Sequence, residues 1–440
     1  MALDARVLII APDDRLAGPL AEGLDRHGWR SVTARGREAA EAALHDLKIE
    51  VVIVETGDGI EASGLVRALK AVRAPRNLPV VALGRPDALL EEMGFDLALS
   101  PPLHPAQAVL RLEALARGAV AEEEFLLRQE TLAERGRALA PPAPRTGPLK
   151  VLTVGEPAPK FVALSHALTA LGAEATAALT AYTAFDYLHE EAFDAVVLWA
   201  GQAHAEALSI AGGMRRNTRL YHIPTVLYLR EGAEVRLEDA FNRGLADVAT
   251  AETPADETAR RVISLAKAYR RETTIRQALE LARASGLMDA ATGLFTRELF
   301  ASHLARLANA ARARGRPLSV AVLRIAERPE TAVARHQGWL DRAIPQIGSM
   351  IGRLVRAEDT AARLAPEVFA LALPAAGAGV GRIAAERIAA VIACTAFEAG
   401  GDKPPFTVDF DLGVAELEPG ETAARTLERA AARAMAKRAG

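Results

Sequence analysis

Two arginines and one aspartate in the last third of the chain have side chains that could bind a nucleotide. Arg356 and Asp359 are three residues apart, and Arg387 follows in the segment Ala385-Glu386-Arg387-Ile388. A guanidinium can donate two hydrogen bonds to guanine O6 and N7, stack on the base, or pair with phosphates. A carboxylate can accept from the N1 and N2 hydrogens of guanine. Taken alone, Arg-x-x-Asp more often marks an exposed ion pair at a helix end, worth only about 0.3–0.5 kcal/mol.

The elements around these residues follow from short apolar segments. Leu318–Leu323 and Phe410–Ala415 have the composition of buried strands, and the segment from Val355 to Pro374 is expected to form a hairpin. Five residues separate Asp359 from Ala365, where the turn of that hairpin begins.

From about residue 286 the chain resembles the GGDEF domains of diguanylate cyclases. Residues 289–297 read DAATGLFTR, which is similar to the family's opening D-x-L-T-G-L-x-N-R, and FDLGVA at 410–415 is similar to its late strand. The segments 318–323 and 355–374 match the first strand and the central hairpin in order and spacing. The resemblance implies an adenylyl-cyclase-like α/β domain over residues 286–440.

The same resemblance implies that cyclase chemistry has been lost. A working member holds two metal ions with aspartates of its first strand and with the third residue of GGDEF. Arg324 and Ala326 stand at the aspartate positions, and a cation at a ligand position repels a metal. In the hairpin, Ala365-Pro366 replace the glycines that allow close approach of a nucleotide, Glu367 is retained, and Val368 replaces an acid. We expect no catalytic residues, no metal and no enzyme activity.

The family also carries an inhibitory site for cyclic di-GMP, formed by R-x-x-D five residues before the hairpin and by an arginine of the following helix. Arg356, Asp359 and Arg387 match these positions, and the shared register favours a ligand site over a simple ion pair. Arg353 and Arg312 are assigned supporting roles. Cyclic di-GMP is therefore the expected ligand.

The first 270 residues contain a weak duplication. Three short apolar segments recur 144 or 145 residues later: Val7–Ile10 as Val151–Val154, Val51–Val54 as Ala195–Leu198, and Leu78–Val81 as Ile223–Val226. Helical segments such as 16–26 and 37–47 lie between them. Alternation of buried strands and helices predicts two doubly wound parallel sheets with a flavodoxin-like fold.

Both copies resemble response-regulator receiver domains. The family phosphorylates an aspartate at the end of the third strand, but Glu55 and Trp199 occupy that position here. In the first copy, Gly84 and Pro101 replace the usual threonine and lysine. We expect no regulated phosphorylation, although Glu55 could be either a relic or a fixed mimic of the charge. The implied role is dimerisation or partner docking.

These patterns predict five segments. Receiver-like domains are expected at 1–120 and 149–270, a helix and linker at 121–148, a linker helix at 271–285, and the degenerate GGDEF domain at 286–440. Residues 141–148, PPAPRTGP, cannot form a helix, whereas 122–137 and 255–284 have helical patterns. The apolar side chains at 262, 263, 265 and 266 either pack on their own sheet or pair across a dimer.

Composition excludes several classes of protein. The net charge of −3 gives no bulk basic field for nucleic acid, and no apolar segment approaches the ~18 residues of a membrane span. No signal peptide is recognised at the N-terminus, so a cytoplasmic location is expected. The single cysteine, Cys394, lies in the apolar AAVIAC and is expected to be buried.

The order receiver, receiver, GGDEF resembles that of PleD-type cyclases and their catalytically inactive relatives in alphaproteobacteria. The resemblance implies a homodimeric cyclic di-GMP effector in cell-cycle control at a cell pole. Implied protein partners are the proteolytic adaptor RcdA, the ClpXP protease and the replication inhibitor CtrA. Alternatives are a GTP-sensing pseudoenzyme that uses Glu367 and Asp341, a scaffold that binds no nucleotide, and a residual cyclase.

Overall fold

The computed structural model describes residues 6–56, 62–73, 77–84, 92–100, 103–143, 145–200, 204–217, 219–231, 235–282, 287–400 and 403–436. Its contacts divide the chain into two compact units. Unit 1 comprises residues 1–119 and 144–274, and unit 2 comprises residues 120–143 and 275–440.

The first part of unit 1 is a parallel sheet with strand order β2-β1-β3-β4-β5. Its strands are β1 (Arg6–Ile10), β2 (Arg30–Ala34), β3 (Ile49–Glu55), β4 (Val80–Leu83) and β5 (Leu97–Leu99). Helices α1 (Asp14–Arg26), α2 (Arg37–Asp46) and α3 (Ala62–Arg73) belong to the same part. The central strands are almost wholly apolar because both faces of a parallel sheet are covered.

The second part of unit 1 repeats this order as β7-β6-β8-β9-β10. Its strands are β6 (Lys150–Val154), β7 (Glu174–Ala178), β8 (Ala195–Ala200), β9 (Thr225–Leu229) and β10 (Asp247–Ala249), and its helices are α6 (Pro159–Ala170), α7 (Ala181–Glu190), α8 (His204–Arg216) and α9 (Leu237–Asn242). The order corresponds to 2-1-3-4-5 of flavodoxin-like sheets. The predicted α/β class with two parallel sheets is confirmed.

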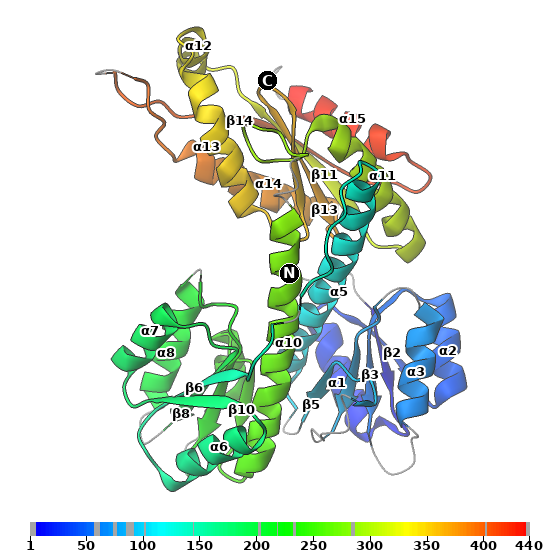
Figure 1. Cartoon of the computed structure of the whole chain (residues 1–440). Coiled ribbons are helices and arrows are strands. Elements are labelled where there is room, and N and C mark those ends of the chain that lie inside the picture. The colour runs from blue at the N-terminus through cyan, green and yellow to red at the C-terminus, as the bar shows by residue number, and fades with distance from the viewer. Residues whose placement is uncertain are drawn as a thin grey trace. The chain divides into compact units, whose positions relative to one another are not determined.

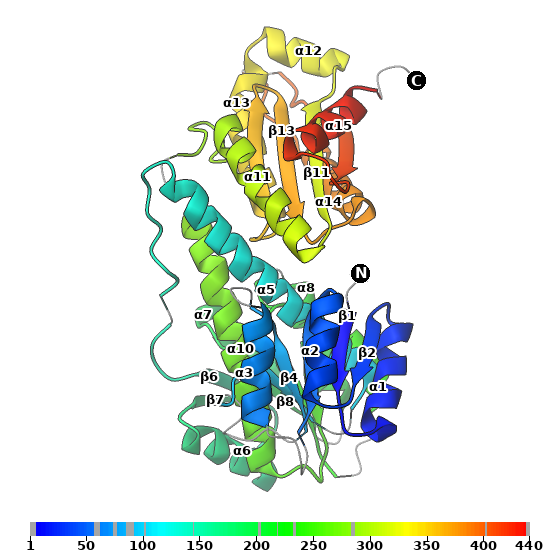
Figure 2. The ribbon, with the colours of Figure 1, turned by 90° about the vertical axis from the view of Figure 1, so that its right-hand side faces the viewer.

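Two long helices, α5 (Pro105–Ala133) and α10 (Ala255–Ala282), begin in unit 1 and end in unit 2. They run side by side (Figure 2). Within unit 1, Leu112 and Ala116 of α5 belong to the same buried cluster as Val262 and Ala266 of α10. The apolar face predicted for residues 262–266 is therefore buried inside this chain.

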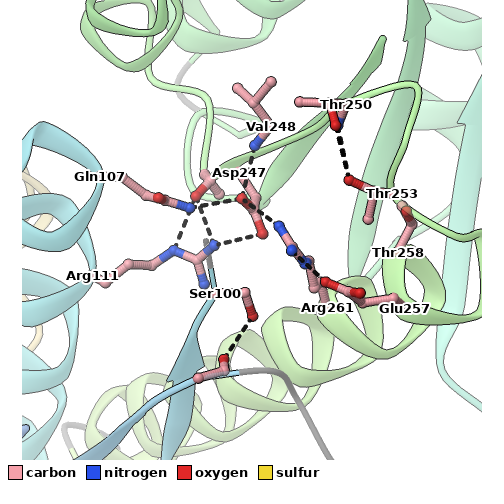
Figure 3. Close-up of polar contacts among 12 residues, drawn as sticks. Ser100, Gln107, Arg111, Asp247, Val248, Thr250, Thr253, Glu257, Thr258 and Arg261 are labelled. Carbon is pink, nitrogen blue, oxygen red and sulfur yellow. Dashed lines mark hydrogen bonds and ion pairs between the residues drawn. The ribbon is translucent and has the colours of Figure 1, made fainter. Parts of the chain in front are cut away.

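A buried polar cluster joins helix α5 to β10 of the second sheet (Figure 3). Asp247 at the start of β10 accepts a hydrogen bond from Gln107 Nε2 (2.6 Å) and lies 3.5 Å from Arg111 Nη2. Arg111 also donates to the carbonyl of Ala246 through Nε (3.0 Å) and Nη2 (2.7 Å). Because these groups are nearly inaccessible to water, each charge depends on the other for compensation.

Unit 2 contains an antiparallel four-stranded sheet with order β12-β13-β11-β14. The strands are β11 (Leu318–Ile325), β12 (Thr360–Ala365), β13 (Val368–Pro374) and β14 (Phe410–Glu416), and the helices are α11 (Arg297–Arg314), α12 (Pro329–His336), α13 (Trp339–Leu354), α14 (Ala378–Ala393) and α15 (Ala423–Ala436). One face of the sheet packs on α13 and α14, and the other packs on α11 and α15 (Figure 1).

Cys394 does not have the predicted environment. It caps the C-terminus of α14 and is exposed, because the apolar face of that helix is carried by Ile388 and Ile392 on other sides. Within the described ranges, none of the helices has the length and apolar character needed to cross a membrane.

Candidate functional site

The hairpin that would cover a nucleotide is formed by β12 and β13. Ala365 and Val368 are paired across it, so that Pro366 and Glu367 make the turn, and a register shift between Arg363 and Ala365 bends the strand. The carbonyl of Glu367 accepts a hydrogen bond from the amide of Ile325 at the end of β11 (3.0 Å). The hairpin tip is thus fixed against the strand end that would carry the metal ligands.

An ion pair occupies that strand end. Arg324 of β11 is opposite Asp411 of β14 in the ladder, and its Nη2 lies 2.7 Å from Asp411 Oδ2. Ala326 is buried, and its amide donates to the carbonyl of Asp409 (2.8 Å). The two positions therefore offer a guanidinium and a methyl group where a metal site needs oxygen ligands.

Glu367, the retained acid of the hairpin, is bound by Arg335 of α12. Nε and Nη2 of Arg335 each lie 2.6 Å from a carboxylate oxygen of Glu367 in a bidentate pair. The Glu367 hydrogen bond raises the pKa of Arg335. Sequence reasoning missed both Arg335 and Asp411. The register of β11 against β14 could have identified Asp411, but nothing in the sequence marks Arg335.

Asp359 lies in the loop between α13 and β12 and is 7% exposed. Its Oδ2 accepts a hydrogen bond from the amide of Arg356 (3.0 Å). Burial, with help from the charge of Glu358, raises the pKa of Asp359 to about 7, against the opposing effect of Arg356. The carboxyl group therefore titrates near neutral pH.

The structure brings three of the predicted arginines to one region. Arg353 is exposed in the last turn of α13, and the exposed Arg356 follows it, with Nη1 3.9 Å from Glu358. Arg387 of α14 donates from Nη2 to the carbonyl of Leu354 (3.0 Å), which lies between them in sequence. A guanidinium group of α14 thus contacts the end of α13, two residues before Arg356.

Arg312 is held elsewhere in unit 2. It lies in the last turn of α11, where it donates to Asn309 Oδ1 (3.0 Å) and to the carbonyl of Glu421, before α15. Glu421 follows β14, which is the sheet edge opposite β12. The structure does not bring Arg312 together with Arg356 and Arg387.

The two predicted acceptor positions of unit 1 have different environments. Glu55 ends β3, and burial together with the charge of Asp13 raises its pKa, whereas Arg15 opposes the shift. Trp199 in β8 is buried, with its ring 5.1 Å from that of Tyr228 in an edge-on contact. Pro101 lies outside the described residues. An indole in the core offers no oxygen for phosphoryl transfer.

In the part of the chain that the structure describes, no group of three or more histidine, cysteine, aspartate or glutamate side chains is arranged to hold a metal ion.

Comparison with known proteins gives a family match for the C-terminal part of the chain. Residues 286–440 match the model for the diguanylate cyclase GGDEF domain. Similar solved structures include the GGDEF domain of DgcB from Caulobacter crescentus in complex with c-di-GMP, which is 27% identical over 35% of this chain and 88% of that one, with a TM-score of 0.33. The coiled coil and GGDEF domain of DgcB, also with c-di-GMP, is 28% identical over 40% and 94%, with a TM-score of 0.33.

A third similar structure is that of the diguanylate cyclase SiaD from Pseudomonas aeruginosa in complex with its activator SiaC. It is 25% identical over 42% of this chain and 70% of that one, with a TM-score of 0.33. No curated protein matches the chain.

Proposed function

Because residues 286–440 form a GGDEF-type domain, we propose that this protein is a cyclic di-GMP-binding effector that no longer makes the dinucleotide. One observation carries the proposal: the hydrogen bond from Arg387 to Leu354 holds the arginine of α14 beside the R-x-x-D segment of Arg356 and Asp359. Two guanidinium groups and a carboxyl group are the chemistry that guanine bases and phosphates require.

Isothermal titration of the full chain with cyclic di-GMP tests this site. We expect Arg356→Ala and Arg387→Ala each to weaken binding about 10- to 100-fold, because a good arginine contact to guanine is worth about 1–3 kcal/mol. Arg382→Ala is the matched control. Arg382 is an exposed arginine of α14 that is 4.0 Å from Glu386, and we expect its removal to leave the affinity unchanged.

Equal affinities for the Arg356 and Arg387 variants and the wild type would reject the site. A parallel titration with GTP separates the alternatives. Preference for GTP favours a GTP-sensing pseudoenzyme, and binding of neither nucleotide favours a nucleotide-independent scaffold.

The proposed loss of catalysis is supported by the groups at the former metal positions. The donor set does not fit a divalent cation, because Arg324 pairs with Asp411, Ala326 offers no ligand, and Glu367 is bound by Arg335. We therefore propose no metal-dependent step for this chain.

We further propose that the two parallel-sheet domains of unit 1 are degenerate receiver domains. The flavodoxin-like strand order supports this, and Trp199 at an acceptor position argues against phosphorylation there. Glu55 keeps a carboxyl group at the acceptor position of the first domain, where it is either a relic or a fixed charge.

At the cellular level we propose the role implied by the architecture, which resembles that of PopA, an inactive relative of PleD-type cyclases. That role is a cytoplasmic homodimer at a cell pole that promotes regulated proteolysis of CtrA by ClpXP through RcdA. Pull-down with purified RcdA, with and without cyclic di-GMP, tests it. Absence of binding in both conditions would contradict it.

A further inference from the structure

A buried ionic cluster lies in unit 2, and two of its members, Glu124 and Arg128, lie outside the family match. Glu124 and Arg128 are one turn apart near the end of α5, and His303 is on α11. Each of the three residues is at most 1% exposed. A helix was predicted here, but nothing in the sequence indicated that its charged residues would be buried.

The guanidinium of Arg128 donates hydrogen bonds to the backbone of the R-x-x-D segment. Nη2 donates to the carbonyls of Asp359 (2.9 Å) and Ala357 (3.0 Å) and to Thr360 Oγ1 (3.2 Å). Nε donates to Glu124 Oε1 (2.7 Å). Two residues of the four-residue motif are therefore held by one side chain from α5.

Glu124 provides the compensating charge. Its Oε1 also accepts from Thr360 Oγ1 (2.9 Å) and lies 2.9 Å from His303 Nε2. Burial opposes ionisation, but His303 and Arg128 together hold the pKa of Glu124 below its ordinary value. A buried ion pair gives little net stability, because desolvation offsets the attraction. The pair instead fixes the position of Arg128, and through it the positions of the carbonyls that Arg128 binds.

Apolar contacts place the same loop on both long helices. Ala357 packs against a small cluster formed by Phe125 of α5 with Ala278 and Leu279 of α10. The loop between α13 and β12 therefore rests on two helices that both begin in unit 1.

We infer that Arg128 is a positioning residue for the proposed cyclic di-GMP site. By binding the carbonyls of Ala357 and Asp359, it holds the loop in the conformation in which Arg356 is exposed and Asp359 accepts the hydrogen bond from the Arg356 amide. This inference rests on the proposed function. It adds that ligand affinity is set in part by a residue of α5, which lies 158 positions before the first residue of the family match.

The test uses the full chain with Arg128→Met, Arg128→Lys and the control Arg111→Met. We expect Arg128→Met to weaken cyclic di-GMP binding about tenfold, in the range usual for coupled groups. Arg128→Lys should weaken cyclic di-GMP binding nearly as much as Arg128→Met does. An ammonium group cannot reproduce the planar guanidinium that reaches Glu124 and two carbonyls. Arg111 is a buried arginine that also binds a carbonyl, but in unit 1. Its variant should bind normally.

Hydrogen exchange in the ligand-free chains gives a second readout. Amides of residues 357–360 should exchange faster in Arg128→Met than in the wild type or in Arg111→Met. If Arg128→Met fails to fold because Glu124 is left uncompensated, Glu124→Gln/Arg128→Met removes that charge and is measured instead.

The outcomes separate the two proposals. If the wild type does not bind cyclic di-GMP, the proposed function fails and this inference falls with it. If the wild type binds and Arg128→Met binds within twofold of it, the positioning role alone is overturned. Weaker binding without faster exchange at 357–360 would also overturn it, because Arg128 would then act by another route.

Discussion

The free fold and the proposed complex favour different protonation states of the Asp359 carboxyl group. In the free fold its carboxyl group is buried, and its pKa is raised to about 7, mainly by that burial. The charged form, in contrast, is the acceptor that guanine N–H groups need. Near neutral pH the residue therefore carries a proton for much of the time, and that proton must leave before the carboxylate can bind the base.

This titration predicts that cyclic di-GMP binds more tightly as pH rises. Below a folded-state pKa of about 7, binding must release a proton, so the dissociation constant should increase about tenfold between pH 8 and pH 6. Titration calorimetry at both values, in buffers of different ionisation enthalpy, measures the affinity and the released proton. In Asp359→Asn the residual binding should not change with pH.

An affinity that is flat from pH 6 to pH 8 would contradict this assignment of the titrating group. A pH dependence that persists unchanged in Asp359→Asn would do the same.

At the level of residues, the sequence suggested candidate positions but not their partners. Family register named Arg356, Asp359 and Arg387 as ligand candidates, and it placed Arg324 where the family has a metal-binding aspartate. The partners of Arg324 and Glu367 were not visible, because Asp411 and Arg335 are 87 and 32 positions away. Burial of Arg128 could not be predicted either, because a charge is tolerated inside a protein only when tertiary contacts supply its partners.

Among the secondary-structure elements, the contact between β14 and α15 explains why residue 413 of β14 is a glycine. A Cβ atom at Gly413 would lie 2.0 Å from the carbonyl oxygen of Ala430 and 2.4 Å from the amide nitrogen of Ala434. Both are backbone atoms of α15, so neither can move aside by rotating a side chain. The strand and the helix can approach this closely only because residue 413 has no side chain.

Gly413→Ala should therefore lower the free energy of unfolding by about 1–3 kcal/mol, the usual cost of overpacking a tight contact. Chemical denaturation of the full chain measures the change. The control is Gly379→Ala in α14, where an added Cβ meets nothing within 4 Å and alanine is the better helix former. Equal stability of the two variants would mean that α15 can shift away from β14.

The long helices were only partly predictable. Their patterns indicated helices over 122–137 and 255–284, and the structure has α5 ending at Ala133 and α10 ending at Ala282. The apolar positions of α10 were recognised, and the choice between its own chain and a dimer partner was left open. Sequence periodicity gives the face of a helix, but not the identity of what covers that face.

For the whole molecule, the duplication predicted from repeated apolar segments is present as two parallel sheets of the same order. Short strands rich in valine and isoleucine are a strong signal, because both of their faces are buried. The assignment of residues 120–143 to the same unit as the last domain was not predicted. Contacts such as that between Glu124 and Thr360 join residues 236 positions apart, which local patterns do not report.

Incubation of the whole protein with GTP and either Mg²⁺ or Mn²⁺ should yield no cyclic di-GMP. Synthesis in this family needs a metal and a nucleotide on each of two domains, so the replacements at Arg324 and Ala326 would be present twice in any dimer. Arg324→Asp alone should not restore activity, because Ala326, Ala365 and Pro366 remain. Chromatographic detection of product from the wild type would contradict the proposed loss of catalysis.

The end of α5 also bears on how such a domain could be inherited. Recombination that moved only residues 286–440 into another gene would leave Arg128 and Glu124 behind, and the transplanted loop would lack the groups that hold its carbonyls. The folded unit therefore contains more residues than the segment 286–440 that matches the family model. Only a transfer that includes the stretch from 120 to 143 would carry the complete fold of unit 2 into a new protein.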